Sequence, residues 1–189
     1  MLRKLGPWLM FVAALFVMSL GIALVTRGNL GTTPISSLPL VSSYASSLTF
    51  GETTFLINLL FVAAQWVLLR RSINKVLLLA QIPITLAFSY FIDTSMKFTE
   101  FLSSDVYWKC LAVSMLGNMV LGLGVALEVF SGAAALPGEG LVLAVSTVLH
   151  KPFSSVKIAN DVILVLLALL LSYFVFHGIR GLREGTIIS

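Results

Sequence analysis

Charge and cysteine are both scarce in this chain. Only 11% of its 189 residues are Asp, Glu, Lys or Arg, whereas 58% are hydrophobic and the mean hydropathy is +1.03. A soluble domain cannot cover its surface with so few charges, so the composition indicates a protein whose solvent is the bilayer. Cys110 is the only cysteine, which excludes a disulfide or a thiolate metal cage within one chain.

The apolar runs lack the alternation of apolar and polar residues typical of membrane strands, so we predict an all-α, polytopic membrane fold. Five runs reach or approach the roughly 20 residues that cross the hydrocarbon as a helix. The first is too long for a signal-peptide core and no small-residue cleavage site follows it, so we expect a retained helix. Basic residues, which bring the net charge to +4, lie in the short links, where they orient helices and indicate no nucleic-acid partner. The predicted spans are 8–25, 54–69, 76–91, 110–130 and 156–176.

Two further segments, 33–47 and 137–150, are too short or too polar to be ordinary spans. A proline, Pro34 or Pro137, stands in each where a helix would begin, and proline suits the first helical turn. Each follows a linker of glycine or small residues, "RGNLGTT" or "SGAAAL". We therefore predict two short helices that interrupt the series of long spans.

The two short segments belong to an internal repeat. Matches at one fixed offset indicate duplication. The predicted parts of the chain are a first repeat over about 8–70, a linking helix over about 75–97, a second repeat over about 110–177 and a polar tail over 178–189. Sliding the sequence by 103 positions without a gap aligns Gly21 with Gly124, Pro34 with Pro137, Ser43 with Ser146, and Phe50 with Phe153.

Three topologies fit this pattern. If both short helices are re-entrant, the chain has five spans and the linking helix inverts the second repeat relative to the first. If both cross, there are seven spans and the repeats are parallel. If only the second crosses, there are six spans. That scheme keeps Arg180 and Arg183 on the same side as Arg3 and Lys4, as the positive-inside rule favours.

The breaks before the two short helices are the best pointers to a binding site. Irregular backbone at membrane depth is tolerated only where protein or a water-filled cavity covers it. Both helix starts would direct free N–H groups and positive dipole ends toward the bundle centre, where an anionic or carbonyl group could bind. The candidate ligand-binding residues at the breaks are Pro34, Ser36 and Ser37 in the first repeat, and Pro137, Gly138, Glu139 and Gly140 in the second.

Two acids stand where the first repeat has neutral residues. Glu139 is equivalent to Ser36, and Asp161 is equivalent to Asn58. A carboxylate in a first helical turn can interact with the helix dipole at headgroup level, or it can be a proton or cation site. Asp161 can pair with Lys157 one turn earlier or face a cavity. Both alternatives stay open, and Asn58 and Asp161 complete the candidate site.

Catalytic and metal-binding patterns are missing from the sequence. It has no HExxH, no GxSxG, no glycine-rich phosphate loop and no cysteine pair, and its two histidines are far apart. We therefore expect no enzyme, no cofactor and no metal site.

Several stretches together resemble a known family. "LGIALVTRGNLGTTPISSLP", "QIPITLAFSYFID", "LGVALEVFSGAAALPGEGL", "FSSVKIANDV" and "GIRGLREGTII" are similar to the YczE-like group of bacterial integral membrane proteins and, more loosely, to the YitT-like proteins. The resemblance covers nearly the whole chain. It implies a multi-spanning protein of the bacterial inner membrane, without established function and without ligand residues to carry over. "LGTTPISS", "LPGEG" and "REGT", which holds Arg183 and Glu184, look characteristic. Members usually continue past "REGTII" into another apolar segment, so a longer form of this chain would carry a further helix.

The leading functional hypothesis is a small secondary transporter or exporter of an unknown small polar or amphipathic molecule, with its site at the membrane midplane. The alternatives are a substrate-binding membrane subunit of a larger uptake complex and a non-transporting scaffold or assembly factor. The expected partners are the lipid bilayer and that molecule. Small residues such as Gly117, Gly122 and Gly124 also leave a homo-oligomer open. We expect multi-pass insertion in the bacterial inner membrane with a cytoplasmic N-terminus.

Overall fold

The computed structural model describes residues 2–69, 75–103, 106–178, 181 and 186, and for residues 2–5 and 75 it describes the backbone alone. These parts form seven α-helices and one 3₁₀ turn, η1 (Glu100–Leu102), and contain no strand. The predicted all-α fold is confirmed. Three residues that the sequence analysis singled out lie outside the described residues, namely Arg180, Arg183 and Glu184.

Five of the described helices are long and apolar enough to cross a membrane. They cover the five predicted spans and extend beyond them at most ends, so the protein is a polytopic helical membrane protein. They are α1 (Leu2–Arg27), α3 (Phe50–Leu69), α4 (Lys75–Phe98), α5 (Tyr107–Ser131) and α7 (Phe153–Phe176).

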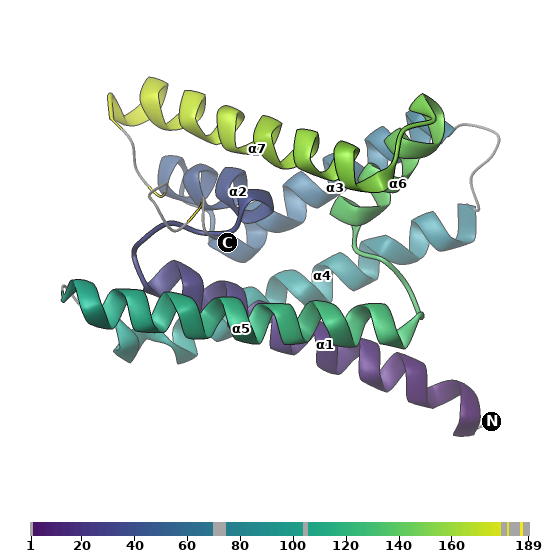
Figure 1. The fold of residues 1–189 in the computed structure, drawn as a ribbon, viewed down its shortest axis with the longest axis horizontal. Helices are drawn as coiled ribbons and strands as arrows, with labels where there is room; N and C mark the ends of the chain where they lie inside the picture. The colour runs from purple at the N-terminus through teal and green to yellow at the C-terminus, as the bar shows by residue number, and fades with distance from the viewer. Residues whose placement is uncertain (1, 70–74, 104–105, 179–180, 182–185, 187–189) are drawn as a thin grey trace.

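The two short helices begin at the predicted prolines. α2 (Pro34–Ala45) has 12 residues and α6 (Pro137–Leu149) has 13, so each rises only about 18–20 Å, less than the hydrocarbon thickness. The residues before the prolines are extended, as a following proline favours. In Figure 1 each helix starts near the middle of the bundle and returns toward the end from which its linker came. Both short helices are therefore re-entrant.

The two repeats are inverted relative to one another. α1 and α5 pack side by side and run in opposite directions (Figure 1). A Cβ added at Gly21 would lie 2.5 Å from Leu121 N, and one added at Gly124 would lie 2.7 Å from Met18 N. Gly21 and Gly124 are equivalent at the 103-residue offset, and so are Met18 and Leu121. The glycine of each repeat therefore makes the same contact with the other repeat. A pseudo-two-fold axis therefore crosses the α1–α5 interface.

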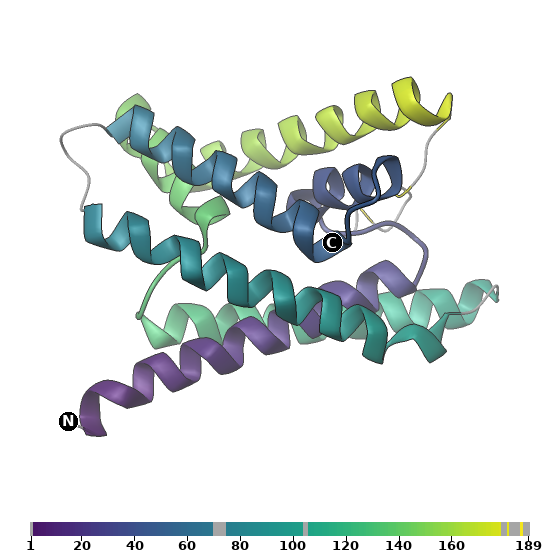
Figure 2. The same ribbon diagram turned by 180° about the vertical axis from the view of Figure 1, so that it is seen from behind.

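The other repeat helices exchange partners. α2 packs more extensively on α7 than on its neighbour α3, and α6 packs more extensively on α3 than on its neighbour α7. α7 also runs antiparallel to its equivalent α3 (Figures 1 and 2). The arrangement is that of the five-span scheme, because seven spans would make α1 and α5 parallel and six spans would make α3 and α7 parallel.

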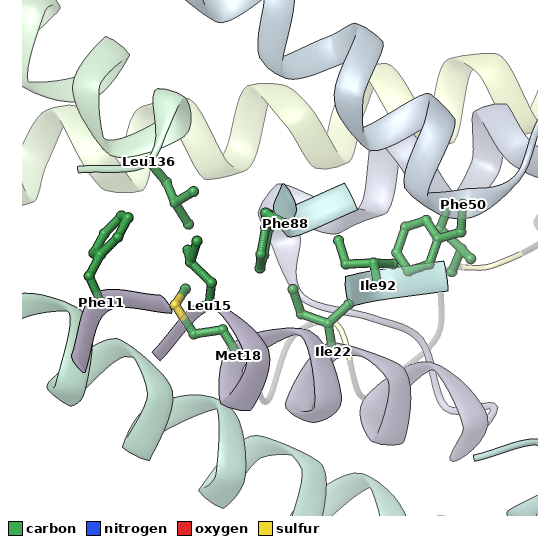
Figure 3. Close-up of a cluster of buried hydrophobic side chains, with 9 residues drawn as sticks. Phe11, Leu15, Met18, Ile22, Phe50, Phe88, Ile92 and Leu136 are labelled. Carbon is green, nitrogen blue, oxygen red and sulfur yellow. The ribbon is translucent and has the colours of Figure 1, made fainter. Parts of the chain in front are cut away.

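α1 is the most enclosed of the five long helices. From Phe11 to Ile22 its buried apolar side chains recur every three or four residues and so lie on one face, and from Gly21 to Val25 every residue is buried. Figure 3 shows that face, formed by Phe11, Leu15, Met18 and Ile22, meeting side chains from α4, from the start of α3 and from the α5–α6 linker, namely Phe88, Ile92, Phe50 and Leu136. α1 therefore joins the break before α6 and the start of α3 to the linking helix.

Candidate functional site

A cavity of about 290 Å³ lies where the two repeats meet. All seven helices contribute to its walls, and the starts of α2 and α6 both reach it. A volume near the lower end of the range for ligand pockets suits a small metabolite. The cavity lies at the place that the two helix breaks predict.

Most of the lining residues come in equivalent pairs, as expected for a cavity on the pseudo-two-fold axis. Each member of a pair is separated from the other by 103 positions. The pairs that line the cavity are Met18 and Leu121, Ile22 and Val125, Thr33 and Leu136, Ile35 and Gly138, Ser36 and Glu139, Thr54 and Lys157, and Asn58 and Asp161.

The polar pairs differ in charge in one consistent way. The first repeat contributes neutral groups, and at each equivalent position the second repeat contributes an ionisable one. The cavity thus has a neutral polar side and a charged side, although the backbone around it is nearly symmetric. The pairs concerned are Ser36 with Glu139, Thr54 with Lys157, and Asn58 with Asp161.

The start of α2 presents an unengaged hydroxyl to this cavity. Thr33 occupies the N-cap position, but its side chain does not cap the helix. It is buried and lines the cavity, and within the described residues its Oγ1 has no hydrogen-bond partner. Ser36, also buried, lines the cavity one turn further on. Ser37 does not line it, and its hydroxyl donates to the Pro34 carbonyl at 2.6 Å.

The start of α6 is held in place from two neighbouring helices. Glu128, near the end of α5, is only 2% exposed, and its Oε1 accepts the Leu136 N–H at 3.2 Å. Its Oε2 has no hydrogen-bond partner in the described part of the chain. From α3, Gln65 Nε2 donates to the Pro137 carbonyl at 3.2 Å, and Gln65 exchanges hydrogen bonds with Gln81 of α4. These contacts fix the break before α6.

Gly138 and Ile35 mark the point where the two breaks meet. A Cβ added at Gly138 would collide with Ile35 Cδ1, and the two positions are equivalent in the repeats. A residue that touches its own equivalent lies at the symmetry axis. The missing side chain at 138 leaves the room that Ile35 needs, so the two helix starts approach each other closely.

The charged side of the cavity contains one ion pair. Lys157 Nζ lies 3.0 Å from Asp161 Oδ1, which confirms the predicted pairing, and both residues line the cavity. Glu139, in the first turn of α6, is partly exposed and lines the same cavity. Among the described residues it takes part in no salt bridge. Within the described ranges, the Glu139 carboxylate is therefore the ionisable group of this site that stands outside the ion pair, although the Lys157 ammonium also attracts it electrostatically.

Six of the nine candidate residues line the cavity, and three do not. Ser37 is fully buried beside Pro34, Pro137 is engaged through its carbonyl, and Gly140 faces Gln65 and Gln81. The six that the structure brings together are Pro34, Ser36, Asn58, Gly138, Glu139 and Asp161.

Four polar or charged residues of the site were missed as site residues by the sequence analysis, and Thr33, whose unengaged hydroxyl lines the cavity, is one of them. Thr54 and Lys157 are equivalent at the 103-residue offset, so comparing every polar pair between the repeats would have found them. Glu128 is the one acid in the run 110–130, which was itself a signal because acids inside spans are rare.

In the described ranges, no three His, Cys, Asp or Glu side chains come together in a way that could hold a metal ion. The chemistry that the site offers is therefore hydrogen bonding, ion pairing and proton binding by side chains.

Comparison with known proteins gives one match. The model of a family of unknown function matches residues 5–189. No curated protein and no solved structure matches the chain.

Proposed function

Since the chain belongs to DUF6198, a family of unknown function, we propose a function from the cavity itself: secondary transport of a small polar or amphipathic molecule. One observation carries the proposal, namely a cavity at the junction of two inverted repeats, lined by equivalent residues from both and reached by the starts of both re-entrant helices. Inverted repeats with broken helices that meet at a central site are a recurrent design of secondary transporters.

Inverted repeats also supply a mechanism for alternating access. Two equivalent halves of one sequence can exchange conformations, so that the site opens first to one side of the membrane and then to the other. Here α2 packs mainly on α7 and α6 mainly on α3. Opening one side therefore requires one such cross-repeat pair to separate while the other stays closed, with the α1–α5 contact as the fixed support.

The two sides of the cavity offer different interactions to a ligand. Ser36, Thr33 and Asn58 offer hydrogen bonds from the neutral side, and the unpaired Glu139 carboxylate offers a charge from the other. Lys157 and Asp161 form an ion pair, so this side of the cavity offers an ammonium to an anionic ligand group and a carboxylate to a cationic one. We assign no catalytic step to these groups, because the sequence carries none of the common catalytic motifs.

The proposal places the protein in a bacterial inner membrane with its N-terminus in the cytoplasm, in line with the resemblance to the YczE-like group. α1 begins at the end of the bundle where α3 ends and α4 begins (Figure 1). In sequence, Arg3 and Lys4 flank the first of these helix ends and residues 70–75, with three basic residues, flank the other two. The positive-inside rule assigns such an end to the cytoplasm.

Reconstitution of the protein alone tests the proposal. Proteoliposomes are loaded with a bacterial metabolite extract, and solutes lost to the outside are identified by mass spectrometry. We expect at least one solute to leave faster than from protein-free liposomes, and Glu139→Gln to abolish the difference. Glu52→Gln is the matched control, because Glu52 is exposed in the first turn of α3, outside the cavity, and only accepts the Thr49 N–H there.

Absence of any solute flux would contradict transport by the chain alone. Two further measurements then separate the alternatives. Co-purification with an ATPase from native membranes supports a subunit of an uptake complex, and complete indifference of the purified protein's melting temperature to metabolites supports a scaffold.

A further inference from the structure

The cavity carries an unbalanced negative charge. Among the residues that the structure describes, the ionisable ones in its lining are Glu139, Lys157 and Asp161, and Lys157 is already paired with Asp161. When all three are charged the sum is one negative charge, which belongs to Glu139. A lone charge inside a membrane protein is expensive and is normally neutralised by a partner. The site is therefore stable when Glu139 receives either a proton or a cation.

The rest of the lining suits an organic cation. Phe61 and Phe88 line the same cavity, and aromatic faces attract ammonium groups, quaternary ones included. Asn58 and Thr54 add neutral oxygen acceptors, and Thr33 adds its unengaged hydroxyl. A metal cation would need several oxygen ligands drawn close together, whereas one carboxylate with aromatic and apolar walls fits a small organic monocation.

We propose that Glu139 binds a small organic monocation and a proton in turn, so that the protein exchanges the one for the other. The inference rests on the proposed transport function and names its substrate class. In the exchange step the protonated carboxyl releases its proton to water, and the resulting carboxylate forms an ion pair with the incoming cation. The reverse step returns the proton and releases the cation, so charge and atoms balance.

Other charged groups around Glu139 leave this exchange to it alone. Lys157 and Asp161 of α7 neutralise each other across 3.0 Å. Glu128 of α5 does not line the cavity and holds the Leu136 N–H instead. The parts of α1, α2, α3 and α4 that line the cavity contribute no charged side chain. The charge of Lys157 also attracts Glu139 and that of Glu128 repels it, so a cation in the cavity meets a carboxylate that both groups influence and that no described side chain holds in an ion pair.

The test is the binding of tetraethylammonium to the purified full chain, measured by calorimetry at several values between about pH 5 and about pH 9. Because the cation displaces one proton, the Kd for tetraethylammonium should fall as the pH rises, by up to about tenfold per pH unit while Glu139 titrates. Once Glu139 is fully ionised, the Kd should no longer change with pH. In the pH range where Glu139 ionises, calorimetry in two buffers of different ionisation enthalpy gives the number of protons released on binding. We expect up to about one proton per cation bound. Butanesulfonate, an anion of similar size, should not bind.

Glu139→Gln should weaken tetraethylammonium binding at least tenfold and remove its pH dependence, while Glu52→Gln leaves both unchanged. Thermal unfolding of each variant shows whether it folds. If Glu139→Gln does not fold, the proton count on the native protein decides the matter, because cation binding without proton release at any pH overturns the exchange.

Results that overturn this inference differ from those that overturn transport. Binding of butanesulfonate but not of tetraethylammonium, or cation binding that is independent of pH and of Glu139, refutes the exchange even where proteoliposomes show flux of another solute. Cation binding with proton release but without flux of any solute refutes transport and leaves the exchange site standing.

Discussion

Glu128 shows how much depends on a single side chain at a helix break. Its carboxylate is almost completely buried at the end of α5, and Oε1 accepts the N–H of Leu136, the residue before the proline that starts α6. A backbone N–H at membrane depth must find a partner within the protein. Glu128 therefore acts as a positioning residue, which holds the α5–α6 linker so that Glu139 can reach the cavity.

Substituting Glu128 separates its hydrogen bond from its charge. Glu128→Gln keeps a carbonyl oxygen that can accept the Leu136 N–H, so we expect its melting temperature to stay close to that of the native protein. Glu128→Leu leaves that N–H without a partner and should lower stability by about 1–3 kcal/mol. Thermal unfolding in detergent measures both. An equal loss in the two variants would show that the charge, rather than the acceptor, is needed.

The ion pair in the cavity makes a second prediction at this scale. Lys157→Met or Asp161→Asn alone leaves the other residue charged and unpaired beside the cavity, whereas the double variant leaves neither charge. We expect each single variant to be less stable than the double, with a coupling energy of about 0.5–3 kcal/mol. A double-mutant cycle on melting temperature measures it, and additive losses would mean that the pair contributes nothing to stability.

Among the described helices, the contact between α1 and α5 is the most extensive, and equivalent residues of the two repeats make it. Gly21 and Gly124 each face backbone atoms of the other helix, whereas Gly122, on the same helix as Gly124, faces open space. Only two of the three glycines expected at a helix contact, Gly117 and Gly124, take part in this one. The inverted repeats are therefore joined by glycines at equivalent positions.

Alanine substitutions test that contact. Gly21→Ala and Gly124→Ala each place a methyl group against backbone atoms of the facing helix, which cannot move aside as a side chain can. We therefore expect each substitution to lower the free energy of unfolding by about 1–3 kcal/mol. Gly122→Ala is the matched control and should be neutral or stabilise by about 0.5–1 kcal/mol, because alanine favours helix. The melting temperatures of the three variants decide this, and equal effects at Gly21 and Gly122 would argue against the close contact.

The elements themselves were predictable from the sequence to a large extent. Long apolar runs give five spans because length and hydropathy alone decide whether a helix can cross the hydrocarbon. Pro34 and Pro137 give the starts of the short helices because proline is favoured in the first helical turn. The fixed offset of 103 gives the repeat. The apolar runs do not show in which direction each helix crosses the membrane. Positive-inside counting therefore favoured six spans, whereas α7 runs antiparallel to α3, as five spans require (Figures 1 and 2).

The site was predictable in part, and the reason is physical. Residues at a break, such as Ser36 and Glu139, stand out because the break itself is visible in sequence. Whether a residue on the first turn faces the cavity depends on helix rotation, which tertiary packing sets, and so Ser37 and Gly140 point elsewhere. Lys157 was seen as a partner of Asp161 but not as part of the cavity, because cross-repeat packing brings α7 there.

At the scale of the whole molecule, the inverted arrangement fixes which connections share a side of the membrane. α2 returns to the end of the bundle where α1 finished, and α6 returns to the opposite end, where α5 finished (Figure 1). The α2–α3 connection and the α6–α7 connection must then lie on opposite sides. With a cytoplasmic N-terminus, the first is outside and the second is inside.

Cysteine accessibility tests this arrangement. In a Cys110→Ala background, Ser47→Cys marks the α2–α3 connection and Lys151→Cys marks the α6–α7 connection, and both native residues are exposed. We expect a membrane-impermeant maleimide to label Ser47→Cys on intact cells and to label Lys151→Cys only after permeabilisation. The six-span scheme, in which α6 crosses, instead puts both positions outside. Labelling of Lys151→Cys on intact cells, with Ser47→Cys also labelled, would therefore contradict the re-entrant α6 and with it the symmetry on which the central cavity depends.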